Sequence, residues 1–425
     1  CPSFQATREE QNATRGRANL LRAMISSNYQ LPITNTITES VFTSLDLCLA
    51  CKGCKSECPS GVDMAKIKFA FMDEYYKTHR RPLRDYIFGY FHTVSALLAP
   101  IAPLANAIMS FDPTRKLIAK ITGITTERPF PKYSTKRASV ARVSNPRNRI
   151  LFLSDAFTRY IEPQIEQAAF DVLTRLGVDV QVIPVVGAGA SLLSKGFIDA
   201  ARHHAERVLA AIQRLDPNGE TAIVGLEPPD LYCLKHDYRD LLPARAAELA
   251  AITRRTWLLD EWLLRSSEFV NSSPLPGGEG PGRRAEPVEA VREKLLFHPH
   301  CHQRAESAAD DGQPTGPAAT IAALRHCGYE VEFSDAGCCG MAGTFGYEAE
   351  HYDLSMKVGE LKLLPSIRPL LPPPNAQADG GLSTKMSVAN LGEVVSTGSA
   401  CRLQIEQGAK VNTTHPIVLV ARVLK

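Results

Sequence analysis

Cys48-Leu-Ala-Cys51-Lys-Gly-Cys54-Lys-Ser-Glu-Cys58-Pro59 is the stretch of this chain that constrains its fold most strongly. Four cysteines fall in the pattern C-x2-C-x2-C-x3-C-P, which rarely arises by chance. Two-residue spacers let the backbone wrap a cubic [4Fe–4S] cluster, so that three thiolates meet three irons. The fourth cysteine, followed by proline, points away and ligates the other cluster of a two-cluster module. The stretch therefore predicts a compact iron–sulfur module.

The first residues, Cys1-Pro2-Ser3, have the sequence with which a second such run would end. Under the crossed pairing, Cys1 supplies the fourth ligand to the first three cysteines of the run. This predicted ligand set is Cys1, Cys48, Cys51 and Cys54. Cys58 then needs an upstream triad that does not occur in this sequence. We therefore expect the chain to be the C-terminal part of something longer, and it also lacks an initiator Met.

Length, charge and cysteine spacing narrow the class of protein. At 425 residues the chain is expected to form about two to four domains. A formal net charge of +3 is small for this size and gives no reason to expect a nucleic-acid partner. The 11 cysteines have metal-ligand spacing rather than the pattern of a secreted disulfide framework. We therefore expect a reducing, cytoplasmic compartment.

One segment, Tyr86 to Phe111, is long enough to span a bilayer and contains no Asp, Glu, Lys or Arg. Pro100 and Pro103 interrupt it, and several polar residues dilute its apolar character. We favour a buried or interfacial helical hairpin at 86–111. The alternative is peripheral contact with the inner face of a membrane or with a quinone-side partner.

The order of apolar patterns predicts an α+α/β fold class. Residues 1–80 are expected to form a helical ferredoxin-like [4Fe–4S] module, and residues 81–148 a helical connector. From Arg149 onward, apolar strands alternate with amphipathic helices, which is typical of a parallel sheet. The first strands are expected at 149–154, 178–183 and 221–226, with helices at 163–176 and 197–215.

The α/β pattern then repeats, which predicts an internal duplication. Three stretches of the first copy align with three of the second. They are 150–153 with 295–298, 176–189 with 327–340, and 223–230 with 394–401. We call residues 149–265 copy 1 and residues 291–425 copy 2 of a duplicated α/β cysteine-rich domain.

Two low-complexity stretches lie outside this pattern. Residues 266–290 are rich in Gly and Pro and are expected to be a flexible linker between the copies. A second stretch, near 370–390, interrupts copy 2. We expect both stretches to be exposed and dispensable for function.

Copy 2 contains a second group of cysteines, each placed where a strand is expected to end. They are Cys301, Cys338, Cys339 and Cys401. Loops at the carboxyl ends of parallel strands converge on one crevice, so these four thiolates would meet. An adjacent cysteine pair suits an iron–sulfur cluster better than one small tetrahedral ion. The alternatives are a zinc site, or buried free cysteines, which is our interpretation of Cys233 and Cys327.

Other residues near these cysteines are candidates for tuning the two sites. Glycines at 340, 343 and 346 are expected to form a turn into a helix, whose N-terminus would stabilise the thiolates. Histidines at 298, 300 and 302 flank Cys301 and either are structural or donate hydrogen bonds to cluster sulfur. Arginines at 8, 15 and 17 lie near Cys1 and either are solvated or neutralise the cluster anion.

Copy 1 keeps the α/β pattern but lacks the cysteines. Opposite Cys338-Cys339-Gly340 it has Gly187-Ala188-Gly189. Opposite Cys401 it has Asp230, and opposite Cys301 it has Ala156. We therefore expect one metal site in the duplicated part, with copy 1 acting as its lid.

Together these motifs resemble one family, the C-terminal iron–sulfur half of fusions between an FAD-linked oxidase and an iron–sulfur oxidoreductase. The chain is similar to the iron–sulfur subunits of glycolate oxidase, anaerobic glycerol-3-phosphate dehydrogenase and lactate-utilisation systems. A more distant resemblance is to the cysteine-rich subunit of heterodisulfide reductase. The stretches that carry the resemblance are 1–10, 14–19, 48–59, 298–303, 337–346 and 399–405.

The resemblance implies the iron–sulfur electron-transfer portion of a flavin-dependent D-2-hydroxyacid dehydrogenase, of the glycolate, D-lactate or 2-hydroxyglutarate type. Its partners would be an FAD-containing domain or subunit and an acceptor, such as a quinone or a ferredoxin-like protein. The implied [4Fe–4S] ligands are Cys1, Cys48, Cys51, Cys54 and Cys58. The implied Cys-Cys-Gly site, which we expect to hold a further cluster, is Cys301, Cys338, Cys339 and Cys401.

Members of the family often carry a Cys-Cys-Gly motif in the first copy as well, where this chain has Gly187-Ala188-Gly189. No catalytic acid or base is expected in this chain, since electron transfer requires none. Two alternatives remain open. One is a thiol/disulfide reductase-type catalytic subunit similar to heterodisulfide reductase, and the other is a zinc-stabilised interaction protein.

Overall fold

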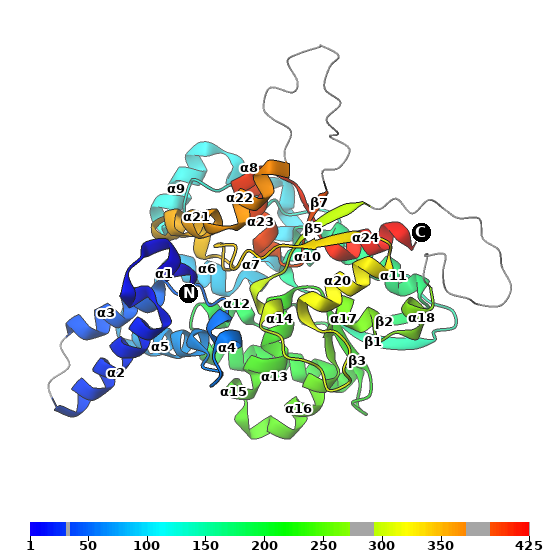
Figure 1. The fold of residues 1–425 in the computed structure, drawn as a ribbon, viewed down its shortest axis with the longest axis horizontal. Helices are drawn as coiled ribbons and strands as arrows, with labels where there is room; N and C mark the ends of the chain where they lie inside the picture. Colours follow the sequence, from blue (N-terminus) through cyan, green and yellow to red (C-terminus); the bar gives the residue numbers. More distant parts are fainter. Residues whose placement is uncertain (31–34, 273–292, 371–391, 425) are drawn as a thin grey trace, which may run out of the picture.

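The computed structural model of the chain describes residues 1–30, 35–272, 293–370 and 392–424. Helices form the N-terminal part and two parallel sheets follow, so the mixed helical and α/β architecture is confirmed (Figure 1). Most of the linker predicted at 266–290, and nearly all of the insert predicted near 370–390, lie outside the described residues. The start of the predicted linker differs, because Ser267–Val270 form helix α18, in which Phe269 is buried.

The N-terminal module is helical, as its sequence predicts. Its helices are α1 Pro2–Thr7, α2 Thr14–Gln30, α3 Asn35–Asp46, α4 Gly53–Glu57 and α5 Met64–Thr78. The Asp63 side chain caps α5 by accepting the backbone N–H groups of Ala65 and Lys66. The cysteine run occupies the segment between α3 and α5, which includes the short helix α4. Ala50 and Lys52 have φ angles of 48° and 59° there, because the loop winds back on itself.

The connector contains α6 Leu83–Gly89, α7 Phe91–Leu98, α8 Ala102–Ser110 and α9 Asp112–Thr122. A short 3-10 turn, Ala99–Ile101, joins α7 to α8, so Phe91–Ser110 forms a single rod that is long and apolar enough to cross a membrane. Only 22% of its most apolar window is buried. The segment is helical, as predicted, but of the two positions expected for 86–111, buried or interfacial, the buried one is wrong. The chain turns at Phe111, and α9 then packs against α8 (Figure 1).

Each α/β unit contains one four-stranded parallel sheet. The first sheet has the strand order β2-β1-β3-β4, and the second has the order β6-β5-β7-β8. The first four strands are β1 Asn148–Leu153, β2 Val178–Val182, β3 Ala222–Gly225 and β4 Thr256–Leu258. The second four are β5 Lys294–His298, β6 Glu330–Phe333, β7 Glu393–Ser396 and β8 Thr413–Thr414. The outer strands β4 and β8 were not among the predicted strands.

In each unit the helices alternate along the chain with the strands of its sheet. Those of copy 1 are α10 Ala156–Tyr160, α11 Pro163–Arg175, α12 Ala190–Ser194, α13 Ile198–Leu215, α14 Pro228–Tyr232, α15 Tyr238–Leu241, α16 Ala246–Arg254 and α17 Leu259–Leu263. Those of copy 2 are α19 Cys301–Arg304, α20 Gly316–His326, α21 Tyr352–Leu361, α22 Leu363–Ile367, α23 Ser399–Ala409 and α24 Pro416–Val423. Helix α11 packs on α24 and α17 packs on α20, so one hydrophobic core runs through both units.

Strand pairing is equivalent in the two sheets. Ile150 pairs with Val180 in the first sheet, and Leu295 pairs with Val331 in the second. Under the sequence alignment of the two copies, these are equivalent pairs. The reciprocal contacts α11–α24 and α17–α20 also relate the units as a two-fold axis would. Both observations support the internal duplication, which remains a prediction.

Candidate metal centres

Four of the five N-terminal cysteines line one cavity of about 100 Å³. They are Cys1, Cys48, Cys51 and Cys54. Helix α1 brings Cys1 to the loop that holds the other three. Cys58 does not line this cavity, and backbone N–H groups of Val62 and Ser60 lower the pKa of its thiol. This is the division of ligands that the crossed pairing predicts, and the ligand assignment itself remains a prediction.

Arg17 lies against this cavity and is almost completely buried. Its Nη1 donates to Cys1 Sγ at 3.1 Å, and its Nε donates to the Ser44 carbonyl oxygen at 2.9 Å. Burial lowers the pKa of Arg17, although the neighbouring thiols favour its charged form. Of the three arginines named from the sequence, this one is therefore placed to neutralise a thiolate-bound anion. Arg15 is exposed and pairs with Glu10 instead.

The four cysteines of copy 2 come together as neighbouring thiols. The thiol of Cys338 contacts those of Cys301 and Cys339, and Cys339 contacts Cys401. Through these contacts the pKa values of Cys301 and Cys339 fall well below the usual range, while those of Cys338 and Cys401 rise well above it. The loops at the ends of β5, β6 and β7 thus bring four soft sulfur ligands to one place.

The two groups of cysteines are contiguous. Cys51, from the N-terminal run, contacts the Cys338 thiol, and this contact lowers the pKa of Cys51. Nothing in the spacing of the sequence predicts this meeting, because the two residues belong to separate motifs. Its consequence is that a centre in the N-terminal module and a centre in copy 2 would lie side by side.

The backbone after Cys339 differs from its prediction. The chain passes through 3-10 turns at Phe345–Tyr347 and Ala349–His351, and helix α21 begins only at Tyr352. The turn at the glycines thus leads into α21 only through two 3-10 turns, so the Cys338–Cys339 pair does not lie at the N-terminus of that helix. Cys401 lies in the first turn of α23, but its contact with Cys339 and its burial raise the pKa of its thiol despite the helix dipole.

The three histidines take different positions around the thiols. His302 Nδ1 lies 3.6 Å from Cys301 Sγ, and His300 Nδ1 lies 4.0 Å from it. His298 is fully buried, and neither of its ring nitrogens has a hydrogen-bond partner among the described residues. It nevertheless lies close enough to the Cys339 thiol to lower its pKa. Burial of an imidazole without a hydrogen-bond partner costs free energy of folding. His298 therefore suits a site whose sulfur atoms accept a hydrogen bond.

In copy 1, the carboxyl group of Asp230 occupies the position that aligns with Cys401 of copy 2. Asp230 Oδ1 accepts the Ala188 N–H at 2.7 Å, and the N–H groups of Gly189 and Ala190 also favour its charged form. These amides belong to the loop that aligns with Cys338-Cys339-Gly340. A Cβ atom on Gly187 would lie 3.2 Å from Asp230 Oδ1. The Asp230 carboxyl group therefore lies in copy 1 where the cysteine thiols lie in copy 2.

A larger cavity of about 250 Å³ separates this part of copy 1 from Cys301. Two acidic residues that the sequence did not single out, Asp155 and Glu227, line it together with Asp230. Burial raises the pKa of Glu227 to about 8, and the nearby Asp155 adds to the effect. Burial also raises the pKa of Asp230 to about 6. Only the alignment of the copies, which places Asp155 opposite His300, could have drawn attention to these positions.

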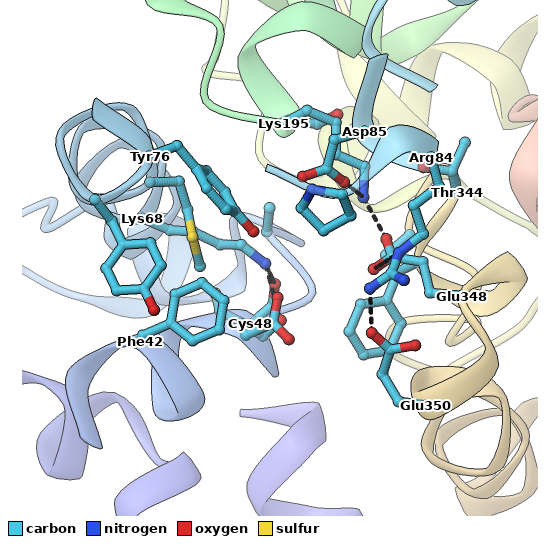
Figure 2. Close-up of a pocket in the computed structure, with 18 of the residues that line it drawn as sticks. Phe42, Cys48, Lys68, Tyr76, Arg84, Asp85, Lys195, Thr344, Glu348 and Glu350 are labelled. Carbon is cyan, nitrogen blue, oxygen red and sulfur yellow. Dashed lines mark hydrogen bonds and ion pairs between the residues drawn. The ribbon is translucent and has the colours of Figure 1, made fainter. Parts of the chain in front are cut away.

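A third cavity, of about 420 Å³, lies where the module, the connector and both copies meet (Figure 2). Its polar wall contains a buried ion network in which Lys195 binds Glu348 and lies 3.3 Å from Asp85. Lys68 donates to the Cys48 carbonyl oxygen at 2.8 Å on the opposite wall. Figure 2 shows these side chains pointing into the same space. The Lys195 network ties the connector to both α/β units, while Lys68 holds the cysteine loop within the module.

Cys233 and Cys327 are the remaining cysteines, and both are buried. Burial raises the pKa of the Cys233 thiol well above its usual range and that of Cys327 to about 12. Cys233 Sγ donates to the Ala188 carbonyl oxygen, and Cys327 packs in the core shared by the two units. The interpretation of both as buried core residues is confirmed.

Comparison with known proteins agrees with this donor chemistry. Residues 1–63 match the model of a family described as a 4Fe-4S dicluster domain. The chain is 24% identical to the glycolate oxidase iron-sulfur subunit of Escherichia coli, over 100% of the chain and 91% of that protein. It is 25% identical to one of the subunits of the anaerobic glycerol-3-phosphate dehydrogenase of E. coli, over 82% of the chain and 79% of that protein.

A third relative is much longer than this chain. The chain is 24% identical to a D-2-hydroxyglutarate dehydrogenase of Pseudomonas putida over 99% of its own length, which is 41% of that protein. The chain therefore spans about two fifths of the curated dehydrogenase. These relatives and the domain match confirm the resemblance to iron–sulfur subunits of oxidoreductases.

Proposed function

We propose that this chain, a relative of iron–sulfur oxidoreductase subunits, is the electron-transfer portion of a flavin-dependent D-2-hydroxyacid dehydrogenase of the glycolate, D-lactate or 2-hydroxyglutarate type. It would pass electrons from reduced FAD, on a partner domain or subunit, to an acceptor. The observation that carries the proposal is the contact between Cys51 and Cys338, which joins the two groups of cysteines. The printed names of the relatives support the substrate class.

The proposal assigns ligands by position. A [4Fe–4S] cluster would be held by Cys1, Cys48, Cys51 and Cys54, which line one cavity. Cys58 would serve a second cluster together with three cysteines from outside this chain. Cys301, Cys338, Cys339 and Cys401 would hold a further cluster. Each cluster supplies reversible one-electron storage, which splits the two electrons of a reduced flavin into single steps.

The chain's own residues would set the conditions for this transfer. Arg17 offsets negative charge at Cys1, and the unpartnered His298 is available to donate to sulfur beside Cys339. Copy 1 would be a duplicate whose ligands were lost and whose Asp230 now occupies the empty position. In this arrangement copy 1 covers the thiols of copy 2 rather than holding a cluster of its own.

Iron analysis of defined variants tests the proposal. We expect anaerobically reconstituted chain to bind iron and acid-labile sulfide. Cys51→Ser should abolish the signal of the N-terminal cluster in electron paramagnetic resonance, and Cys338→Ser that of the copy 2 site. Cys327→Ser, at a buried cysteine away from both sites, is the matched control and should retain both signals. If the purified chain contained zinc and no iron, the zinc-stabilised interaction protein would be the better hypothesis. If it reduced disulfides catalytically, the thiol/disulfide reductase would be.

The location proposed for the chain is cytoplasmic, peripheral on the inner face of the membrane. On the rod of α7 and α8, the large apolar residues Leu97, Ile101, Leu104 and Ile108 are exposed at spacings of four, three and four residues. They therefore form one stripe along the rod. Leu117 and Ile121 extend it onto α9, where Lys116 and Lys120 are also exposed. An apolar stripe beside cations suits an anionic lipid surface.

Vesicle binding tests this location. Vesicles of phosphatidylcholine and phosphatidylglycerol should bind the chain, and added salt should weaken the binding. Leu104→Glu should reduce the affinity by at least about tenfold without loss of fold, because this side chain is 59% exposed. Leu361→Glu, at an exposed leucine of α21, is the control and should bind as the unmodified chain does. Equal binding by both variants would rule out the stripe as the contact.

A further inference from the structure

Arg304 is a partly buried cation beside the copy 2 thiols. It is the last residue of helix α19, which begins at Cys301. Burial lowers the pKa of its guanidinium, but three of the four thiols favour its charged form. They are those of Cys301, Cys338 and Cys401. Arg304 therefore stands in the same relation to this site as Arg17 does to the N-terminal one.

The guanidinium of Arg304 is held in place by the loop that runs from β6 to Cys338. Its Nη2 donates to the carbonyl oxygen of Ser334 at 2.8 Å and to that of Ala336 at 2.6 Å. Its central carbon lies 4.9 Å from the centroid of the Phe333 ring. The side chain thus connects helix α19 to the loop that carries the Cys338 thiol.

One donor of this guanidinium has no partner. Arg304 Nε is buried and makes no hydrogen bond among the described residues. His298, whose ring nitrogens also lack a partner there, lies beside the Cys339 thiol. Sulfur atoms of a bound cluster would accept these hydrogen bonds and remove the cost of leaving the donors unpaired. The copy 2 site therefore fits a group that carries negative charge on sulfur.

The cations around the N-terminal site are already engaged. Each nitrogen of Arg17 has a hydrogen-bond partner, since Nη2 donates to Ser3 Oγ at 2.9 Å in addition to the bonds of Nε and Nη1. Lys52 is held by two carboxylates, and Lys55 donates to the hydroxyl of Tyr232. These side chains have less freedom than Arg304 to donate to cluster sulfur.

The described carboxylates near Arg304 do not cancel its charge. Asp335 favours the charged form of Arg304, but its side chain is 88% exposed and pairs with Lys362. Glu162 is bound to Arg402, so these two charges offset each other. Within the described part of the chain, Arg304 itself has no ion-pair partner.

Two buried carboxyl groups of copy 1, Asp155 and Glu227, line the cavity next to Cys301. Burial raises the pKa of both, and that of Glu227 reaches about 8, which favours its neutral form at neutral pH. Burial also disfavours the charged imidazole of His300, but the Cys301 thiol outweighs burial and raises the pKa of His300 to about 9. The buried groups around the thiols therefore leave the positive charge of Arg304 in place.

We propose that Arg304 makes the copy 2 site the more easily reduced of the two iron–sulfur sites in this chain. The inference rests on the proposed function, which assigns a cluster to each site. Reduction adds one negative charge, which the cation and the free Nε of Arg304 stabilise more than the engaged Arg17 does at the other site. Because Cys51 and Cys338 are in contact, an electron that enters at the N-terminal site would settle at the copy 2 site. The transfer moves one electron and neither forms nor breaks a bond.

Reductive titration of the reconstituted chain, followed by electron paramagnetic resonance, tests the order of reduction. The signal that is missing from Cys338→Ser belongs to the copy 2 site. With limiting dithionite this signal should appear first, with a preference of at least about tenfold over the N-terminal site, or about 59 mV for one electron. Reduction of the N-terminal site first, or of both sites together, would overturn the inference.

Arg304→Gln tests the residue itself. Loss of the cation should make the copy 2 site at least about tenfold harder to reduce and leave the N-terminal site within about twofold of its original equilibrium. Arg325→Gln is the matched control, because Arg325 is exposed on α20 and bonds only to a carbonyl oxygen of β6 among the described residues. An unchanged copy 2 potential in Arg304→Gln would contradict the assignment.

Arg304→Lys separates the charge from the position of the loop. Lysine keeps the positive charge but lacks the planar fork that binds two carbonyl oxygens. The copy 2 site should then stay within about threefold of its original equilibrium. An equal loss in Arg304→Lys and Arg304→Gln would mean that loop geometry sets the potential, and would overturn the inference. If Arg304→Gln bound no iron at this site, a loss of tenfold or more in Arg304→Lys would overturn it as well.

The outcomes distinguish this inference from the function on which it rests. A chain that binds iron at both sites, but whose N-terminal site is reduced first, would refute the role of Arg304 alone. A chain that binds no iron would refute the proposed function.

Discussion

At the residue scale, Gly340 shows how little space the Cys338–Cys339 loop leaves. Its φ of +95° is in the left-handed region, and a Cβ atom there would overlap the Ser355 carbonyl oxygen. Gly340→Ala should therefore cost about 2 kcal/mol or more and lower the iron content of the copy 2 site. Gly337→Ala is the matched control, because a Cβ atom at Gly337 would meet nothing within 4 Å. Denaturant unfolding and iron analysis of both variants test this expectation. Equal losses of stability and iron in Gly340→Ala and Gly337→Ala would contradict it.

In the N-terminal module, Arg17 is the residue beside the cysteines whose replacement we expect to have the clearest effect. Arg17→Gln should destabilise the chain by about 2 kcal/mol, because the bonds to Cys1 Sγ and the Ser44 carbonyl are lost in a buried place. It should also make the reduction potential of the adjacent cluster more negative, since no cation offsets the added electron. Redox titration and chemical unfolding measure the two effects.

The control for Arg17 is Arg15, whose side chain is 78% exposed. Arg15→Gln should change stability by no more than about 0.5 kcal/mol and leave the potential unchanged. If Arg17→Gln altered stability but not the potential, Arg17 would be a structural residue and not a charge that acts on the cluster.

At the scale of elements, local patterns predicted most of the central strands and helices. Strands β1, β2 and β3 and helices α11 and α13 lie within about two residues of their expected ranges, because apolar periodicity is a local signal. The two- and three-residue strands β8 and β4 are too short to carry such a pattern. The exposure of the rod at Phe91–Ser110 does not follow from its sequence, because an uncharged segment gives no indication of which face will be buried.

An ion pair between elements predicts a dependence of stability on pH. His351 Nε2 lies 2.9 Å from Asp46 Oδ2 of α3, and its Nδ1 lies 3.3 Å from Glu348 Oε2. Burial opposes the charged imidazole, but the two carboxylates outweigh it and raise the pKa of His351 to about 9. The folded pKa thus exceeds the unfolded one. The stabilisation is complete below about pH 6.5 and is lost as the pH rises to about 9.

The expected loss is on the order of 3 kcal/mol across that interval. Denaturant unfolding at a series of pH values should show it in the unmodified chain and not in His351→Gln. His203→Gln, at an exposed histidine of α13, should retain the full dependence. If the stability of His351→Gln still fell with rising pH, the pH dependence would belong to another titratable group.

At the scale of the whole molecule, the sequence predicts which residues form each site but not how the sites meet. Equivalent strand ends bring Cys301, Cys338 and Cys401 together, and this follows from topology alone. The contact of Cys51 with Cys338 depends on how the module docks on the α/β units. That docking is fixed by side chains far apart in the chain, such as the network of Lys195 and Glu348 in Figure 2. No local pattern encodes such pairs.

Lys52 is one of the residues that hold the module against copy 1. It lies between Cys51 and Gly53, its side chain is completely buried, and its Nζ lies 3.0 Å from Asp63 and 3.4 Å from Asp237 of copy 1. Lys52→Ala leaves the buried Asp237 carboxylate with Lys66, 3.7 Å away, as its remaining cation, so we expect a loss of about 2 kcal/mol, less than for a buried charge left without any partner. Because that cost falls on the interface, we expect the module to unfold before the α/β units.

Calorimetry tests this expectation. The reconstituted chain should unfold in one transition, and Lys52→Ala should show two, with the earlier one accompanied by release of iron from the N-terminal module. Lys77→Ala is the matched control, because Lys77 is exposed on α5 and pairs with Glu74 within the same helix. A single unchanged transition in Lys52→Ala would mean that the contact between Cys51 and Cys338 is held by other interactions, with the network around Lys195 as the next to be tested.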